Sequence, residues 1–197
     1  MDRLEIRDLL ENWVIWRDSG QWDRFATLWH SDARMAATWQ QSSATDFIAA
    51  CRAAWGAGPT GLHNLGGSSI DVAGKRAIAQ TKMTIHQRAP IHGVLVDVAC
   101  MGRFYDFLEK RDGRWGIVLR QPIYERDSLR PVNPGEPVEL DQALLGAFPE
   151  GYRHLAYLQS NMGLQVKADM PGLADDIVES LYARGRDWLA GTSDYPG

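Results

Sequence analysis

Apolar residues recur every three or four positions through the first part of the chain, the spacing of amphipathic helices. In residues 2–19 an apolar side opposes a charged one, and Ser19-Gly20 then ends the pattern. Past this helix, the pattern predicts a short helix at 22–29, a turn at 30–32, a strand at 33–40 and a third helix that ends near Trp55. The first third of the chain is therefore mostly helical.

From His63 onward the period changes from helical to alternating, which is typical of strands with one buried face. Strands are expected at about 63–72, 76–88, 94–110 and 114–126. Asp112-Gly113 favours a tight hairpin between the last two, because both residues tolerate positive backbone φ. The pattern predicts an α+β fold in which N-terminal helices cover one side of a strongly curved antiparallel sheet and enclose a pocket.

The chain changes character near residue 129, so we expect a domain at 1–128 followed by a C-terminal helical extension at 129–197. Three prolines and a glycine lie close together at 131–137 and predict a stiff linker. Helices are expected at about 141–147, 150–162 and 173–190. The extension would pack on the main domain or on a neighbouring subunit.

Composition narrows the class of protein. The 197 residues are 45% hydrophobic and carry a net charge of −4, so a real core is expected and nucleic acid is not an expected partner. The N-terminus has no signal-peptide pattern, and no apolar run approaches the thickness of a bilayer. Cys51 and Cys100 form no ligand motif, which favours two buried thiols in a cytoplasmic protein without a membrane partner.

Asp18 is the first candidate for chemistry. It follows Val14 by four residues and Leu10 by eight, so a helix places its carboxylate on an apolar side. Such a carboxylate is costly unless it is paired or used, and the expected partners are His63 and His86. The alternatives stay open: the aspartate could point to solvent at the helix end, and either histidine could be structural.

Four segments, in this order, resemble the SnoaL-like branch of the nuclear transport factor 2-like superfamily, and within it the scytalone dehydratases and hexachlorocyclohexane dehydrochlorinases. The resemblance covers about residues 2–126. The segments are Arg17-Asp18-Ser19-Gly20-Gln21-Trp22-Asp23-Arg24, Leu62-His63-Asn64-Leu65-Gly66-Gly67, His86-Gln87-Arg88 and Asp112-Gly113-Arg114-Trp115. The resemblance implies a cone-shaped α+β barrel that often forms dimers or trimers and works without metal or cofactor.

The resemblance also implies roles for individual residues. Asp18 would be the catalytic aspartate, His63 the general base and His86 a second active-site histidine, while Arg120 falls where the dehydrochlorinases carry an arginine. An interior Arg120 could instead only pair with Asp97 or Glu125. The sequence also departs from the dehydratases. Two tyrosines are replaced at Arg17 and Ala37, and a serine and an asparagine at Gly102 and Phe104, so scytalone itself is a poor expectation for the substrate.

The leading hypothesis is therefore a cofactor-independent lyase of the dehydratase type, acting through an Asp–His pair on a small aromatic or alicyclic molecule. The alternatives are an isomerase of the same fold and a non-catalytic binding or assembly module. Flat aromatic side chains are expected to line the substrate pocket: Trp16, Trp39, Phe104 and Tyr105. The remaining histidines are expected at the surface: His30, His92 and His154. No metal, no cofactor and a homo-oligomer are expected.

Overall fold

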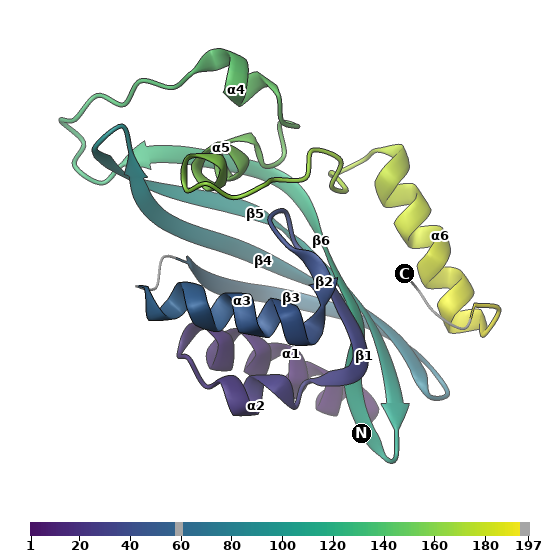
Figure 1. Cartoon of the computed structure of the whole chain (residues 1–197). Helices are drawn as coiled ribbons and strands as arrows, with labels where there is room; N and C mark the ends of the chain where they lie inside the picture. The colour runs from purple at the N-terminus through teal and green to yellow at the C-terminus, as the bar shows by residue number, and fades with distance from the viewer. Residues whose placement is uncertain (58–60, 194–197) are drawn as a thin grey trace.

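A computed structural model describes residues 1–57 and 61–193 of the chain. One curved sheet separates two unequal layers of helices (Figure 1). The helices are α1 (Asp2–Asp18), α2 (Trp22–Ala26), α3 (Ala44–Gly56), α4 (Gln142–Gly146), α5 (Arg153–Asn161) and α6 (Asp176–Ala190). The strands are β1 (Trp29–Ala36), β2 (Gln41–Ser43), β3 (Gly61–Ala73), β4 (Arg76–Ile91), β5 (Val94–Arg111) and β6 (Arg114–Pro131).

The sheet confirms the predicted α+β class. Its strand order is β2-β1-β6-β5-β4-β3, and β3 to β6 pair antiparallel along nearly their whole length. The predicted Asp112-Gly113 hairpin is present, with φ of 50° and 79° at its two residues. One correction concerns β1, which pairs parallel with β6, so the sheet is mixed rather than wholly antiparallel.

The start of the sheet was also predicted incorrectly. The helix expected at 22–29 ends at Ala26, and the strand expected at 33–40 begins at Trp29. Its first residues pair with β6, more than eighty positions away, and His30 is buried there with Nε2 2.9 Å from the Glu109 carbonyl oxygen. A contact so distant in sequence overrides the local turn signal. The expectation that His30 lies at the surface is therefore wrong.

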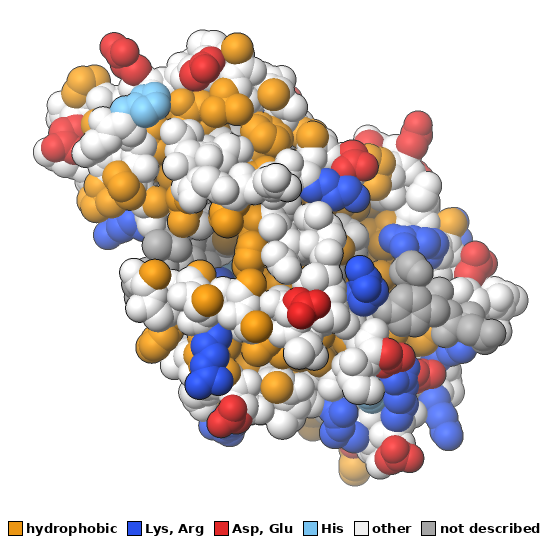
Figure 2. All heavy atoms as spheres, viewed as in Figure 1, with side chains coloured by type: hydrophobic (Ala, Val, Ile, Leu, Met, Phe, Trp, Pro, Cys, Tyr) orange, Lys and Arg blue, Asp and Glu red, His pale blue; other side chains and the backbone are white. Residues whose placement is uncertain are grey.

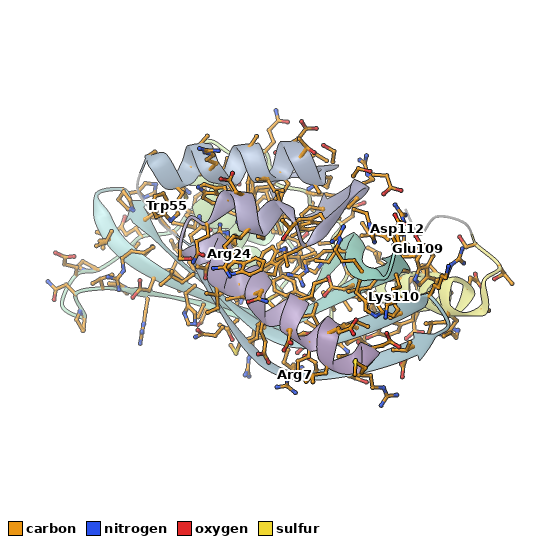
Figure 3. The ribbon with its side chains drawn as sticks, turned by 90° about the horizontal axis from the view of Figure 1, so that it is seen from below. Arg7, Arg24, Trp55, Glu109, Lys110 and Asp112 are labelled. Carbon is orange, nitrogen blue, oxygen red and sulfur yellow. The ribbon has the colours of Figure 1, made fainter. Side chains whose placement is uncertain are left out.

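Helix α1 crosses the pocket-side face of the sheet and is fixed at both ends. At its start the Asp2 carboxylate accepts hydrogen bonds from Lys110 Nζ at 2.7 Å and Trp115 Nε1 at 2.9 Å. Seen from below, Arg7 projects from the outer side of this helix (Figure 3). Its last residue is Asp18, so the fixed helix delivers one carboxylate to a defined place over β3.

Side chains of alternate residues in β5 enter two different cores. Phe104 belongs to the large core between the sheet and helices α1, α3 and α5. Its neighbour Tyr105 belongs to a smaller core beneath α6, on the opposite face of the sheet. There α6 approaches closely at Gly185, where an added Cβ would lie 1.9 Å from the Tyr105 hydroxyl. The small second core therefore requires glycine at that position.

The part of the chain after β6 packs on the sheet at two places, and β6 itself runs to Pro131, past the boundary expected at residue 128. Helix α5 lies on the pocket side against β4, β5 and β6, whereas α6 covers part of the outer face (Figure 1). All three expected helices are present, with shorter bounds. Cys51 and Cys100 are both buried and unbridged, as expected. No helix within the described residues is long and apolar enough to cross a membrane.

Candidate active site

The Asp18 carboxylate holds His63 at two points. One oxygen, Oδ2, accepts the backbone N–H of His63 at 2.6 Å, and the other, Oδ1, lies 3.0 Å from His63 Nδ1. Arg17 Nη1 donates to the same Oδ1 at 3.0 Å and to the Gly61 carbonyl oxygen at 2.7 Å. A carboxylate can only accept, so Nδ1 carries the proton and Nε2 keeps the lone pair.

Apolar rings enclose the imidazole. The Trp13 ring meets it edge-on, with centroids 5.4 Å apart, and Phe104 lies 6.2 Å away on another side. The side chains of His63 and Asp18 are only 9% and 13% exposed. The ring is therefore fixed in orientation by the carboxylate and in position by its aromatic neighbours.

Burial and charge determine the protonation state of this pair. Burial lowers the pKa of His63 below its ordinary value. The hydrogen bond that His63 donates to Asp18 opposes this, and the charges of Arg17 and Arg120 lower the pKa further. For Asp18, burial alone would raise the pKa, but the hydrogen bonds to His63 and the Arg17 charge outweigh it and lower the pKa. At neutral pH the pair is thus a carboxylate beside a neutral imidazole.

Arg120 lies behind this pair and not at the cavity wall. Its guanidinium is fully buried and forms a two-point ion pair with Asp106, at 2.6 and 2.9 Å. It also stacks on the Trp13 and Phe104 rings, at 4.3 and 4.2 Å from their centroids. The expected alternative partners of Arg120 form ion pairs with other arginines: Asp97 with Arg88 and Glu125 with Arg103. Arg120 therefore contacts the two rings that lie against His63, and its charge lowers the pKa of His63.

A cavity of about 170 Å³ opens beside the imidazole. Hydrophobic side chains gather between α5 above and α3 below, where elements that line this cavity meet at the surface (Figure 2). The lining comes from α1, α3, the β1–β2 turn, five strands, α5 and the segment just after α5. It includes Trp13, Arg17, Met35, Ala37, Thr38, Trp39, Phe47, Gly61, His63, Ile85, Gln87, Phe104, Pro122, Tyr124, Leu155, Gln159, Met162 and Leu164.

Two of the four predicted substrate-binding aromatics line this cavity, Trp39 and Phe104. The other two do not. Trp16 lies beneath the Arg24 guanidinium, 4.5 Å from its ring centroid, and Tyr105 faces α6 on the outer side of the sheet. For Tyr105 the reason is strand alternation, since its neighbour Phe104 already occupies the inward position.

His86 does not meet Asp18 and His63, so that part of the prediction is wrong. It pairs with Leu62, whereas the inward-facing His63 pairs with Ile85. The His86 side chain is therefore exposed on the outer face, where Nε2 lies 3.3 Å from Asn64 Nδ2. Alternation brings Gln87 into the cavity in its place.

The sequence reasoning missed the polar part of the cavity wall and the contribution of α5. Thr38, Gln87 and Gln159 were not candidates, although strand parity relative to His63 would have pointed to Gln87. His154, expected at the surface, is instead partly buried against Asp127, with Nδ1 2.7 Å from Oδ1. Within residues 1–57 and 61–193, no three His, Cys, Asp or Glu side chains form a cluster suited to a metal ion.

Comparison with known proteins identifies the family. The model of the SnoaL-like domain matches residues 1–121. The chain belongs to the SnoaL-like family. It is 38% identical to pea pathogenicity protein 2 of Fusarium vanettenii, over 97% of this chain and 87% of the relative, so that match extends through the helical extension.

Solved structures show the same fold. A hexachlorocyclohexane dehydrochlorinase of type 2 aligns with a TM-score of 0.56 and 15% identity, over 72% of this chain and 95% of its own. A putative scytalone dehydratase from Novosphingobium aromaticivorans aligns with a TM-score of 0.51 and 19% identity, over 70% and 95%. The SnoaL-like chain therefore has the nuclear transport factor 2-like fold, and enzymes of the elimination type are among its structural neighbours.

Proposed function

We propose that this SnoaL-like protein is a cofactor-independent lyase that removes water, or a comparable leaving group, from a small ring compound. The observation that carries the proposal is the two-point bond between Asp18 and His63 at the wall of an apolar cavity. A neutral imidazole with a fixed tautomer is a competent base, and the carboxylate stabilises the imidazolium that forms. The dehydratase and dehydrochlorinase neighbours support the same class of reaction.

The proposed reaction is an elimination next to a carbonyl group. His63 Nε2 takes the proton from the carbon beside the carbonyl, and the C–H electron pair moves into an enolate. The enolate then re-forms the carbonyl and expels hydroxide from the next carbon, leaving a double bond. The imidazolium returns its proton to the hydroxide, so water leaves and His63 is neutral again.

Arg17 and Arg120 would stabilise the negative charge that develops in this reaction. Arg17 lines the cavity, where its guanidinium donates to Asp18 and to the Gly61 carbonyl oxygen. Its positive charge at the cavity wall would stabilise an enolate oxygen, a contribution that is commonly a large part of catalysis. Arg120 is more distant and contributes its charge from behind the Trp13 and Phe104 rings.

The size of the cavity limits the substrate to about one ring. A cavity of about 150 Å³ in another protein accommodates benzene, and this one is about 170 Å³. Polycyclic compounds would require the walls to move. A six-membered alicyclic ring that carries a carbonyl and a hydroxyl on the second carbon from it fits both the volume and the chemistry.

The test uses the purified protein with a chelator and no added cofactor. One-ring β-hydroxy ketones are incubated with the wild type and with His63→Gln, and the products are analysed by mass spectrometry for loss of water. Deuterium uptake from D₂O into cyclohexanone measures the proton-abstraction step on its own. We expect both signals from the wild type and neither from the variant.

Each other result has a defined meaning. Water loss that survives His63→Gln contradicts the proposal. A product of unchanged mass with a moved double bond assigns the isomerase alternative, because the base then returns its proton to carbon. If no exchange occurs while one-ring compounds bind, the non-catalytic alternative replaces the lyase.

A further inference from the structure

Three polar side chains, connected by hydrogen bonds, lie along one wall of the otherwise mostly apolar cavity. The Thr38 hydroxyl donates to Gln159 Oε1 at 2.7 Å, and Gln159 Nε2 donates to Gln87 Oε1 at 3.3 Å. Thr38 and Gln159 are only 1% and 4% exposed. All three residues line the cavity that His63 lines.

The chain of hydrogen bonds ends on a weak acceptor. Gln87 Nε2 donates to the Met162 thioether sulfur at 3.4 Å, and sulfur is a poor acceptor compared with oxygen. A primary amide also has two N–H donors, so the Gln87 amide can donate to a better partner. A ligand oxygen in the cavity would provide this half-buried amide with a stronger acceptor than the thioether sulfur.

The Gln87 amide and the proposed base are held at a fixed spacing. His63 on β3 pairs with Ile85 on β4, and Gln87 is two residues further along β4 on the same face. Two residues along a strand span roughly 6.5 Å. A single ring that lies between the two positions can present a C–H to His63 and an oxygen to the amide.

The amides also define the charge of what they bind. Gln87, Gln159 and Thr38 are all neutral, and a neutral amide favours a carbonyl or hydroxyl oxygen over a carboxylate, which needs a cation. The Arg17 cation at the cavity wall is already paired with Asp18. Gln159 comes from α5, beyond the residues 1–121 that match the family model. The extension therefore supplies part of this wall.

We propose that Gln87 and Gln159 form an oxygen-binding subsite that selects neutral, oxygen-bearing single-ring substrates. The subsite rests on the proposed function for its purpose, since it would orient the ring toward His63. It makes the C-terminal extension a determinant of substrate choice and not only a cover for the domain.

The test compares the binding of phenol and toluene, two rings of similar size that differ by a hydroxyl in place of a methyl. Dissociation constants are measured by calorimetry for the wild type, Gln87→Leu and Gln159→Leu. Gln142→Leu is the matched control, because that glutamine is exposed on α4. We expect each subsite variant to lower the preference for phenol over toluene about threefold to tenfold, the effect of one or two neutral hydrogen bonds. The control should not change it.

Toluene binding also reports whether the cavity is intact. A variant that binds toluene as the wild type does, but keeps the wild-type preference for phenol, overturns the subsite. Failure of the wild type to bind either ring overturns it as well.

His63→Gln separates this inference from the lyase proposal. The preference for phenol should survive in that variant, because the amides and not the base bind the oxygen. If deuterium exchange is absent from the wild type while the glutamine variants still lose the preference, the lyase proposal fails and the subsite stands.

Discussion

The molecule contains two Asp–His pairs of nearly the same geometry in different surroundings. In both, one carboxylate oxygen accepts the backbone N–H of the histidine and the other lies beside its Nδ1. The backbone distance is 2.6 Å in each, and the distances to Nδ1 are 3.0 Å for Asp18 and 2.7 Å for Asp127. Bond geometry alone would make both pairs candidates for catalysis.

Their neighbours differ. Asp127 accepts a third bond, from the Leu155 backbone N–H at 2.8 Å, so from β6 it caps the first turn of α5. Its side chain is fully buried, and His154 is not among the residues that line the cavity. His63, in contrast, lines the cavity with two arginine charges near it. The same pair therefore anchors a helix in one place and is suited to accept a proton in the other.

The largest expected effect is on turnover. His63→Gln should reduce kcat/KM for water loss about 10²- to 10⁴-fold, because the proton acceptor is gone. His154→Gln should leave kcat/KM within about twofold of the wild type. Steady-state rates on the same β-hydroxy ketone compare the two variants. Similar losses in both would mean that the cavity does not distinguish the pairs.

Stability, unlike turnover, should depend strongly on the pair formed by Asp127 and His154. Asp127→Ala removes a buried carboxylate that accepts three hydrogen bonds and caps α5, so the free energy of unfolding should fall by about 2–4 kcal/mol. Urea unfolding measures the change. Asp141→Ala is the matched control, because Asp141 caps α4 at an exposed position and should cost about 1 kcal/mol. Equal losses would show that α5 needs no anchor on the sheet.

The pH dependence sharpens the comparison. Burial lowers the pKa of His63, so activity should be flat near neutral pH and fall only below the ordinary histidine value of about 6.5. Protonated His63 cannot accept a proton, so activity falls as the pH is lowered and not as it is raised. Asp18→Asn removes the hydrogen-bonded charge that raises this pKa, so the residual activity should fall at still lower pH. A pH–rate profile in which Asp18→Asn moves the fall to higher pH contradicts this assignment.

Much of the fold could be predicted because its signals are local. Strand alternation and the Asp112-Gly113 turn gave β3 to β6 within a few residues at most ends. The pairing of Asp18 with His63 followed from ordered motifs and from one carboxylate on an apolar helix side. The start of β1 could not be found this way, because it depends on pairing with β6 far along the chain.

The rest of the site depends on register, which no single segment encodes. Whether His86 or Gln87 faces the cavity is decided by the β3–β4 pairing, and a shift of one residue exchanges the two. The same alternation of side chains along a strand places Phe104 and Tyr105 on opposite faces of the sheet. The contribution of Gln159 required knowing where α5 packs, and its anchor is Asp127 on a different element. These features are set by tertiary contacts between elements that are distant in the sequence.

The smallest expected effect tests that parity directly. His86 is exposed on the outer face and its ring bonds only weakly to Asn64. His86→Ala should therefore leave kcat/KM within about twofold and the free energy of unfolding within about 0.5 kcal/mol. Gln87→Leu, one residue away but facing the cavity, should instead change the preference for phenol. If His86→Ala lowered turnover as His63→Gln does, the β3–β4 register would be shifted by one residue, and the inner wall would have to be reassigned along both strands.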